Sequence, residues 1–311
     1  MIDIIVVNWN SGMQLKECIV SVLAHDNGLI SRIIVVDNGS TDGSADEVEG
    51  FSDIEIVRTG ENLGFAAACN IGATLGNSSY LLFLNPDTRL EPSSLEAAFD
   101  FMEDPANSQV GICGIQLIDD TGSVSRSCSR FPTLARLVFY ALGIDKLPGL
   151  HGLGMRIPES AHNNSKRVDQ VMGAFFFMRR EAFDACNGFD ERFFVYFEEV
   201  DLSKRCMLNG WQSWYLDSAR AFHAGGGTSR QVKGLRLFYS LRSRLLYAFK
   251  HFPGWQAWSL LFITTFIEPF TRAAWCILMR DFKGVKHIMT AYRMFICSIS
   301  KIIRGEGRHN P

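Results

Sequence analysis

The stretch YLLFLNPDTRL, residues 80–90, decides how the first part of the chain folds. Its apolar run from Tyr80 to Leu84 is followed at once by Asn85, Pro86 and Asp87. A short, continuous apolar run predicts a strand that is buried on both faces. Asn, Pro and Asp are turn formers, so the strand is expected to end there. Asp87 should therefore lie at the edge of a buried sheet, where its carboxylate is available to a ligand.

Three further apolar runs resemble this one and alternate with helical patterns. The runs are residues 2–7, 32–36 and 54–57, and apolar residues recur at helical spacing in 15–23 and 65–76. Strands that alternate with helices predict a mostly parallel sheet that helices cover on both faces. Ligands of such sheets bind beyond the carboxyl ends of the strands. The polar residues at three strand ends are therefore expected on one edge: Asn8, Asp37 and Asp87.

The rest of the chain is less regular. Residues 143–167, rich in Gly, Pro, His and Asn, are expected to form a long loop. A strand and helix pattern returns at 171–183, and an acidic helix is expected to start near Glu198. The last part of the chain is aromatic, basic and helical in character. We therefore expect a catalytic domain at 1–229 and a helical tail at 230–311.

The net charge of -2 hides an asymmetry. Residues 1–229 carry 17 Lys and Arg against 30 Asp and Glu, whereas residues 230–311 carry 14 against 3. A basic tail on an acidic body predicts an anionic partner for the tail, either nucleic acid or membrane lipid. A hydrophobic fraction of 47% with 24 Phe excludes a disordered chain.

Cysteines and the N-terminus bear on the compartment. The 8 cysteines are scattered without a C-x-x-C pair, which argues against a zinc ribbon and favours a reducing compartment. The N-terminus begins with a strand-like run and lacks the basic and apolar regions of a signal peptide. A catalytic body in the cytosol is therefore expected.

Two carboxylates at strand ends each have two interpretations. Asn85-Pro86-Asp87 is either an ordinary turn or a place where Asp87 binds a divalent cation that bridges a diphosphate. Mg²⁺ and Mn²⁺ prefer carboxylate and phosphate oxygens, which favours the second. Asp37 either forms a local turn or accepts the N–H of a pyrimidine base, with Asn8 beside it. No G-x-G-x-x-G follows the first strand and no G-x-x-x-x-G-K-[ST] occurs, which excludes a dinucleotide fingerprint and a P-loop.

An acidic group follows the aromatic run FFVYF: Glu198, Glu199 and Asp201. Acids at a helix N-terminus are favourable as a solvated, structural feature. An apolar setting would instead raise the pKa of a carboxyl group toward the range of a general base. His223 is likewise either a buried core histidine or a ligand, and its glycine neighbours would let a ligand approach closely.

Several motifs occur in the order found in family-2 glycosyltransferases. They are VVNWN (6–10), VVDNGSTDGS (35–44), NLGFAAACNIG (62–72), FLNPDT (83–88), GAFFFMRREAF (173–183) and GFDERFFVYFEEVDLSKR (188–205), followed by His223. Over about residues 1–229 the chain resembles the bacterial rhamnosyltransferase branch, which builds polysaccharide on lipid carriers. The resemblance implies the glycosyltransferase-A fold, a Rossmann-like α/β fold that binds nucleotide sugars, and an inverting transfer.

The resemblance also implies roles for residues of the donor site. Asp37 would recognise the base and Asn8 would contact the nucleoside. Asp87 would be the last acid of a metal-binding Asp-x-Asp motif, with His223 as a second ligand of Mg²⁺ or Mn²⁺. Asn85, where many relatives have Asp, is counted with the nucleotide-sugar-binding residues. The loop lining the nucleotide and sugar would supply three more: Asn62, Gly64 and Asn70.

The family's catalytic base is usually the Asp of a Glu-Asp pair. The matching pair here is Glu198-Glu199, which puts Glu199 in that position. Asp201 belongs to the same motif, either as a catalytic residue or as one that orients Arg205 or the acceptor.

The tail predicts a membrane surface as its partner. Its longest apolar stretch, residues 257–267, is shorter than the roughly 20 residues that span a bilayer. Aromatic and basic residues alternate along it, which is typical of helices lying in the interface plane. They are Trp255, Trp258, Trp275, Tyr292 and Phe295 with Arg272, Arg280, Lys283, Lys286 and Arg293. The alternative is a helix pair packed on the body; nucleic acid is disfavoured because the basic residues form no solvated stripe.

The resemblance and the tail together imply an inverting rhamnosyltransferase of cell-surface polysaccharide synthesis. It would move L-rhamnose from dTDP-L-rhamnose to a saccharide on polyprenyl diphosphate, at the cytoplasmic face of the cell membrane. One alternative is a transferase of the same fold for galactosyl, glucosyl or N-acetylglucosaminyl groups. Others are a nucleotidyltransferase with a similar sheet and a non-catalytic, membrane-bound protein that senses sugar nucleotides. Whether a second copy of the chain also binds is left open.

Overall fold

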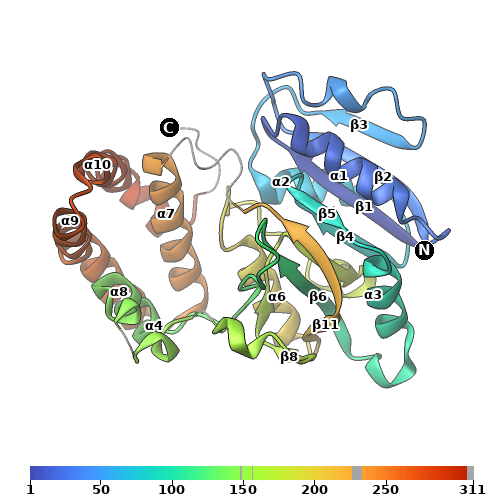
Figure 1. Ribbon diagram of the computed structural model, residues 1–311. Helices are drawn as coiled ribbons and strands as arrows, with labels where there is room; N and C mark the ends of the chain where they lie inside the picture. Colours follow the sequence, from blue (N-terminus) through green and yellow to red (C-terminus); the bar gives the residue numbers. More distant parts are fainter. Residues whose placement is uncertain (148, 156, 226–232, 307–311) are drawn as a thin grey trace.

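The computed structural model describes residues 1–311 except 148, 156, 226–232 and 307–311. Figure 1 shows a sheet covered by helices beside a separate group of helices. The sheet has the strand order β3-β2-β1-β4-β10-β6-β11-β5, with β8 paired to β11. Its strands are β1 (Ile2–Asn8), β2 (Ile30–Asp37), β3 (Ile54–Arg58), β4 (Tyr80–Leu84), β5 (Thr88–Leu90), β6 (Val110–Ile118), β8 (Lys166–Val168), β10 (Phe175–Arg179) and β11 (Gln212–His223). A second, two-stranded sheet joins β7 (Cys128–Ser129) to β9 (Gln170–Val171).

Most strands of the large sheet run in one direction. β1 lies parallel to β2 and β4, β2 to β3, and β6 to β11. β10 runs antiparallel between β4 and β6, and β5 and β8 run antiparallel to β11. The predicted mostly parallel α/β sheet is confirmed, with reversed strands in its second half.

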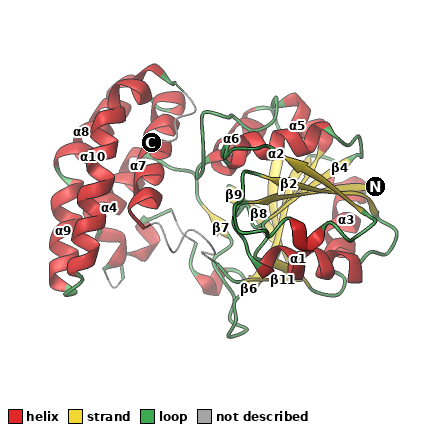
Figure 2. Cartoon of the chain, turned by 90° about the horizontal axis from the view of Figure 1, so that it is seen from above, coloured by secondary structure: helices red, strands yellow, loops and turns green. Residues whose placement is uncertain are grey.

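Helices cover both faces of this sheet (Figure 2). The buried sides of α1 (Met13–Ala24) and α3 (Ser94–Glu103) share one apolar core with the strands. On the other face, α2 (Phe65–Thr74), α5 (Arg180–Ala185) and α6 (Glu198–Leu208) share a second core. A strand between two such layers is buried on both sides, which explains the continuous apolar runs.

The register of the strands brings their carboxyl ends together. Asn8 at the end of β1 is the direct partner of Asp37 at the end of β2. β4 ends at Leu84, opposite Val6, so the segment that follows leaves the sheet at the same edge. In the described part of the predicted loop at 143–167, the regular structure before β8 consists of single turns of 3-10 helix: Ile144–Lys146, His151–Leu153 and Glu159–Ala161.

The C-terminal part is a helical bundle with its own apolar core. It consists of α7 (Lys233–His251), α8 (Gly254–Phe266), α9 (Glu268–Leu278) and α10 (Phe282–Arg304), joined by α4 (Leu134–Leu142). The same core includes Phe193, Phe194 and Val200, so the bundle packs on the body next to α6. The boundary between 229 and 230 lies outside the described residues and stays a prediction.

Part of the tail's aromatic and basic pattern belongs to the interior of the bundle. Tyr292 and Phe295 are buried in its core, and Arg272 pairs with the buried Glu268 at 2.7 Å. Placing these three residues at a lipid surface was therefore wrong, because the pattern along one helix does not say which side faces its neighbours. Trp255 and Trp258 are exposed.

Among the described residues no single helix is long and apolar enough to cross a membrane. α8 and α9, bent by 41° where they join, reach the required length and composition together.

Candidate functional site

A buried polar cluster lies at the ends of β1 and β2. The Asn8 amide donates to Asp37 Oδ1 at 2.9 Å, and it also lies 3.1 and 2.9 Å from the hydroxyls of Ser40 and Ser44. Asp37 Oδ2 lies 3.9 Å from an Arg58 guanidinium nitrogen. Asn8 is 0% exposed and Asp37 4% exposed. Asn8 thus orients the Asp37 carboxylate, and its contact with a nucleoside stays a prediction.

Asn38, which follows Asp37, ties the loop after β2 to the loop before α2. Its amide donates to Asn62 Oδ1 at 3.1 Å and to the Gly64 carbonyl at 3.2 Å, and its Oδ1 accepts from the Leu63 N–H at 2.8 Å. Asn62 Oδ1 in turn accepts the Gly64 N–H at 3.0 Å. Gly64 has a φ of 89°, and a Cβ there would lie 2.5 Å from the Phe194 carbonyl oxygen. The predicted residues Asn62 and Gly64 therefore belong to one loop that Asn38, the residue after Asp37, holds in place.

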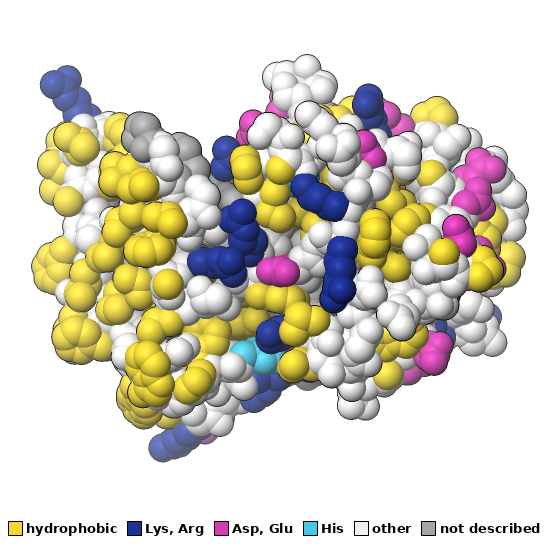
Figure 3. Space-filling view, turned by 90° about the horizontal axis from the view of Figure 1, so that it is seen from below, with side chains coloured by type: hydrophobic (Ala, Val, Ile, Leu, Met, Phe, Trp, Pro, Cys, Tyr) yellow, Lys and Arg dark blue, Asp and Glu magenta, His cyan; other side chains and the backbone are white. Residues whose placement is uncertain are grey.

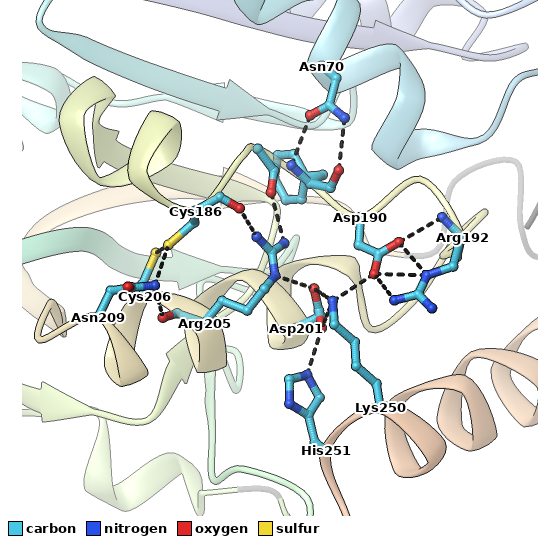
Figure 4. A network of polar contacts seen from close by, with 12 residues as sticks. Asn70, Cys186, Asp190, Arg192, Asp201, Arg205, Cys206, Asn209, Lys250 and His251 are labelled. Atoms are coloured by element: carbon cyan, nitrogen blue, oxygen red, sulfur yellow. Dashed lines mark hydrogen bonds and ion pairs between the residues drawn. The ribbon is translucent and has the colours of Figure 1, made fainter. Parts of the chain in front are cut away.

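Asn70 on α2 binds protein backbone in this structure. Its side chain accepts the Phe189 N–H and donates to the Phe189 carbonyl, both at 2.9 Å (Figure 4). It also lies 3.3 Å from Glu191 Oε1. It clamps α2 to the loop that leads into α6. A direct contact between Asn70 and the sugar nucleotide stays a prediction.

Asp87 and His223 meet at the same edge of the sheet. Asp87 Oδ1 lies 3.3 Å from His223 Nε2, because β5 and β11 pair with Thr88 opposite His223. The Asn85 carbonyl accepts the Thr88 N–H at 3.0 Å, so Asn85-Pro86-Asp87 is both a turn and the carrier of a carboxylate at the edge. The Asn85 N–H donates to the Ala174 carbonyl at 3.1 Å.

A carboxylate beside an imidazole suits a Mg²⁺ or Mn²⁺ ion that takes its remaining ligands from a diphosphate. Over the residues that the structure describes, no group of three His, Cys, Asp or Glu side chains is placed to hold a metal. Asp87 and His223 thus fit a cation held jointly with substrate, and not a complete protein cage. Of the predicted glycines near His223, Gly226 and Gly227 lie outside the described residues.

The acidic helix begins with two buried carboxyl groups. Glu198 Oε2 and Glu199 Oε2 are buried without a hydrogen-bond partner among the described residues. Burial raises the pKa of Glu199 and, together with the charge of Glu199, raises the pKa of Glu198 well above its ordinary value. Glu198 is also close enough to Cys69 on α2 to raise the pKa of that buried thiol, after burial itself. Both carboxyl groups are thus shifted toward their protonated form, and the shift is larger for Glu198.

Asp201, on the same helix, has three nitrogen-bearing partners, Arg205, Lys250 and His251 (Figure 4). Arg205 Nε lies 2.7 Å from Asp201 Oδ2, while Lys250 Nζ and His251 Nε2 each lie 2.7 Å from Oδ1. Burial alone would raise the pKa of Asp201, but the hydrogen bonds from His251 and Lys250 and the charge of Arg205 lower it. The fully buried Asp201 carboxylate is thus held ionised, and both of its oxygens already have partners. This arrangement matches the interpretation in which Asp201 orients Arg205, and we do not retain Asp201 as a base.

Comparison with known proteins identifies the family. Residues 3–186 match the family described as Glycosyl transferase family 2. The chain belongs to this family. It is an enzyme, a family-2 glycosyltransferase, and its curated relatives make it rhamnosyltransferase-like.

Two curated relatives of this glycosyltransferase cover most of its length. It is 27% identical over 267 residues to the N-acetylglucosaminyl-diphospho-decaprenol L-rhamnosyltransferase of Mycobacterium tuberculosis, which covers 82% of this chain and 86% of the relative. It is 25% identical over 256 residues to rhamnosyltransferase WbbL of Escherichia coli, over 79% of this chain and 92% of the relative.

Solved structures of low identity support the fold of the glycosyltransferase. The mannosyltransferase PcManGT of Pyrobaculum calidifontis, in complex with GDP-Man and Mn²⁺, is similar at a TM-score of 0.58 and 14% identity, over 96% of this chain and 87% of that one. S. aureus TarS 1–349 is similar at 0.52 and 13% identity, over 94% and 91%. Together with the family match they support a glycosyltransferase-A-like fold.

Three residues of the glycosyltransferase's site region were not singled out from its sequence. Asn38 directly follows Asp37, and its place in that motif was a usable signal. Lys250 and His251 lie about fifty residues from Asp201 in an amphipathic helix, and no local pattern marks them.

Proposed function

We propose that this glycosyltransferase moves L-rhamnose from dTDP-L-rhamnose, with inversion, to a saccharide carried on a polyprenyl diphosphate. Support for the sugar comes from two relatives, both of them rhamnosyltransferases. One of those relatives acts on a decaprenol-linked N-acetylglucosaminyl diphosphate, by its name. The observation that carries the chemistry is the buried Glu198-Glu199 pair with its unpartnered oxygens.

Glu199 acts as the general base in this proposal. Its carboxylate takes the proton of the acceptor hydroxyl while that oxygen attacks the anomeric carbon from the face opposite the diphosphate. The new carbon–oxygen bond forms as the bond from the anomeric carbon to the phosphate oxygen breaks, and dTDP leaves with the electron pair. Glu199 is less buried than Glu198, so it is the better placed of the two to meet an acceptor.

The donor half of the site is the edge formed by β1, β2 and β4. Asp37, held by Asn8, offers its carboxylate to the pyrimidine base. Asp87 and His223 would hold Mg²⁺ or Mn²⁺, which when bound neutralises the charge of the leaving diphosphate.

We further propose that the bundle lies on the cytoplasmic face of an anionic membrane. Large apolar side chains are exposed along α8, α9 and α10, among them Phe270 at 72% and Leu278 at 73%. Figure 3 shows hydrophobic side chains gathered over the helical side of the molecule. Apolar contact with the membrane interface and attraction of basic side chains to anionic lipid reinforce one another. Exposed basic residues close to this face are Arg280, Lys283, Lys286 and Arg293.

Two experiments test the proposal. In the first, the purified enzyme is incubated with labelled dTDP-L-rhamnose and with UDP-linked galactose, glucose and N-acetylglucosamine, together with a polyprenyl-diphosphate-linked saccharide. Transfer from dTDP-L-rhamnose alone, giving the inverted linkage, is expected. Transfer only from another donor would replace rhamnose with that sugar.

The second experiment measures flotation with vesicles that contain anionic lipid. The intact chain should float at low salt and be partly released at high salt. The double variant Phe270→Ser and Leu278→Ser should remain unbound. The matched control is Leu208→Ser, which changes a residue that is 66% exposed on α6 of the body and should float normally. An intact chain that stays unbound, or that forms a dimer through this face, would remove the membrane from the proposal.

A further inference from the structure

The segment that leads into the acidic helix has an unusual backbone. Tyr196 and Phe197 have φ angles of 67° and 71°, and Phe197 directly precedes Glu198. Two consecutive bulky residues in the left-handed region are unfavourable for L-amino acids. Such a conformation persists only where surrounding contacts hold it. The direction in which Glu198 and Glu199 leave this turn thus depends on those contacts.

Helix α7 of the bundle supplies contacts along the middle of this segment. The Ser243 hydroxyl donates to the Val195 carbonyl at 2.8 Å. The Tyr239 ring stacks on the Phe194 ring with centroids 4.8 Å apart. The segment also touches the body, because the Phe194 carbonyl accepts the Phe65 N–H at 2.6 Å. The turn is thus held between α7 and the start of α2.

The last turn of α7 joins the two ends of the segment through one side chain. Lys250 Nζ lies 2.6 Å from Asp190 Oδ2, before the turn, and 2.7 Å from Asp201 Oδ1, after it (Figure 4). Asp190 is also bound by Arg192 at 2.6 Å, and Asp201 by His251 at 2.7 Å. Lys250 is the one residue of this network in Figure 4 that contacts both carboxylates across the strained turn.

We propose that Lys250 is a positioning residue for sugar transfer. By bridging Asp190 and Asp201 it fixes the Tyr196-Phe197 turn, and so the position of the Glu199 carboxylate relative to the acceptor. The helical bundle is then part of the catalytic scaffold as well as a surface for the membrane. This inference rests on the proposed function, because it acts through Glu199 as the base.

Lys250→Met removes the charge and keeps most of the side-chain length. A base displaced by about an ångström loses much of its effect, so kcat should fall at least tenfold. The KM for the nucleotide sugar should change by less than about twofold, because the donor edge is untouched. Lys250→Arg, which can still bridge two carboxylates, should recover most of the lost kcat. The matched control is Lys16→Met on α1, which breaks the exposed ion pair between Lys16 and Glu47 and should leave kcat unchanged.

A double-mutant cycle separates this inference from the proposed function. If Lys250 acts through Glu199, Lys250→Met should have little further effect on kcat in a Glu199→Gln background. Equal losses in both backgrounds would overturn the role of Lys250 while leaving Glu199 as the base. Near-normal turnover of Glu199→Gln alone would instead overturn the proposed base.

Should Lys250→Met fail to fold, as judged by thermal unfolding and near-UV circular dichroism, Ser243→Ala provides the same test with a smaller change. It removes the hydroxyl that holds the Val195 carbonyl, and a kcat loss of about threefold at unchanged donor KM is expected. An unchanged kcat in a folded Ser243→Ala variant would overturn the positioning role of α7.

Discussion

The first turn of α6 holds three neighbouring acids in two different environments. Toward α7, Asp201 meets Arg205, Lys250 and His251, and these contacts lower its pKa. Toward α2, Glu198 lies near Cys69, and burial raises the pKa values of Glu198 and Glu199. The helix and its dipole are common to both, so the partners make the difference. A buried carboxylate with cations around it holds structure together, whereas buried carboxyls without partners are available for proton transfer.

Removing the charge of Asp201 should have the largest effect on stability. Asp201→Asn leaves the cations on the α7 side without their shared carboxylate, and breaking a buried ion pair on one side costs about 3 kcal/mol or more. Denaturant unfolding at neutral pH would measure this loss. Asp53→Asn, at an exposed position, is the control and should change stability little.

The pH dependence gives this prediction a sign. Despite burial, the pKa of Asp201 is lowered by the hydrogen bond from His251 and by Arg205 and Lys250, and the pKa of Asp190 by hydrogen bonds from Arg192 and Lys250. Their contribution is present above the ordinary carboxyl pKa and is lost as the pH falls through the lowered values. Wild type should lose stability on acidification more steeply than Asp201→Asn. Parallel curves would show that the cluster adds nothing net.

At the start of α6, Glu199→Gln should leave folding intact and reduce turnover. Removing a positioned base costs on the order of 10²-fold in kcat, equivalent to about 2.7 kcal/mol. Steady-state kinetics with the lipid-linked acceptor would measure kcat, and nucleotide-sugar binding should be unchanged. A variant with near-normal turnover would transfer the role of base to Glu198.

Asp87 is a third kind of carboxylate, paired with a histidine at the edge of the sheet. Asp87→Ala and His223→Ala should each weaken nucleotide-sugar binding about tenfold when Mg²⁺ or Mn²⁺ is present, because a ligand of the cation is lost. Calorimetry with and without a chelator would measure this, and the three proteins should bind alike without the cation. Activity that survives exhaustive chelation would show that protein cations neutralise the diphosphate instead.

The sequence predicted the edge of the sheet well because its signals are local. Apolar runs end in Asn8, Asp37 and Asp87, and the parallel register then brings the ends of the strands together. The acidic helix was also predicted, because the aromatic run at 193–197 and the acids at 198–201 are adjacent in the sequence. The different partners of Asp201 and Glu198 on α6 were not predictable, because Lys250 and His251, which bind Asp201, come from a helix distant in sequence.

The backbone before α6 and the orientation of the tail helices escaped prediction for related reasons. Tyr196 and Phe197 are poor candidates for left-handed conformations, so only tertiary contacts place them there. In α10, the aromatic residues Tyr292 and Phe295 were expected at a lipid surface but pack inward. Amphipathic spacing predicts a helix. In a bundle that also exposes apolar side chains, it does not tell which apolar side chains pack against other helices and which face outward.

The smallest predicted effect is that of Glu198→Gln on the free energy of unfolding, which tests the same contrast between partnered and unpartnered acids. The pKa of Glu198 is raised from its ordinary value of 4.5 by burial and then by the charge of Glu199. A carboxyl whose pKa is raised on folding destabilises the folded state increasingly as the pH rises above its unfolded value. Glutamine carries no charge at any pH, so Glu198→Gln should stabilise the protein by about 1 kcal/mol at neutral pH.

This gain should vanish as the pH falls below about 4.5, where Glu198 is protonated in both states. The matched control is Glu47→Gln, at the exposed pair with Lys16, which should show no such gain. Thermal unfolding of the three proteins across this pH range measures the difference. A destabilised Glu198→Gln would mean that the carboxyl has a partner that glutamine cannot replace, and the contrast between Glu198 and Asp201 would fail. A stabilised variant with reduced turnover would mean that the enzyme keeps an unfavourable buried acid because catalysis requires it.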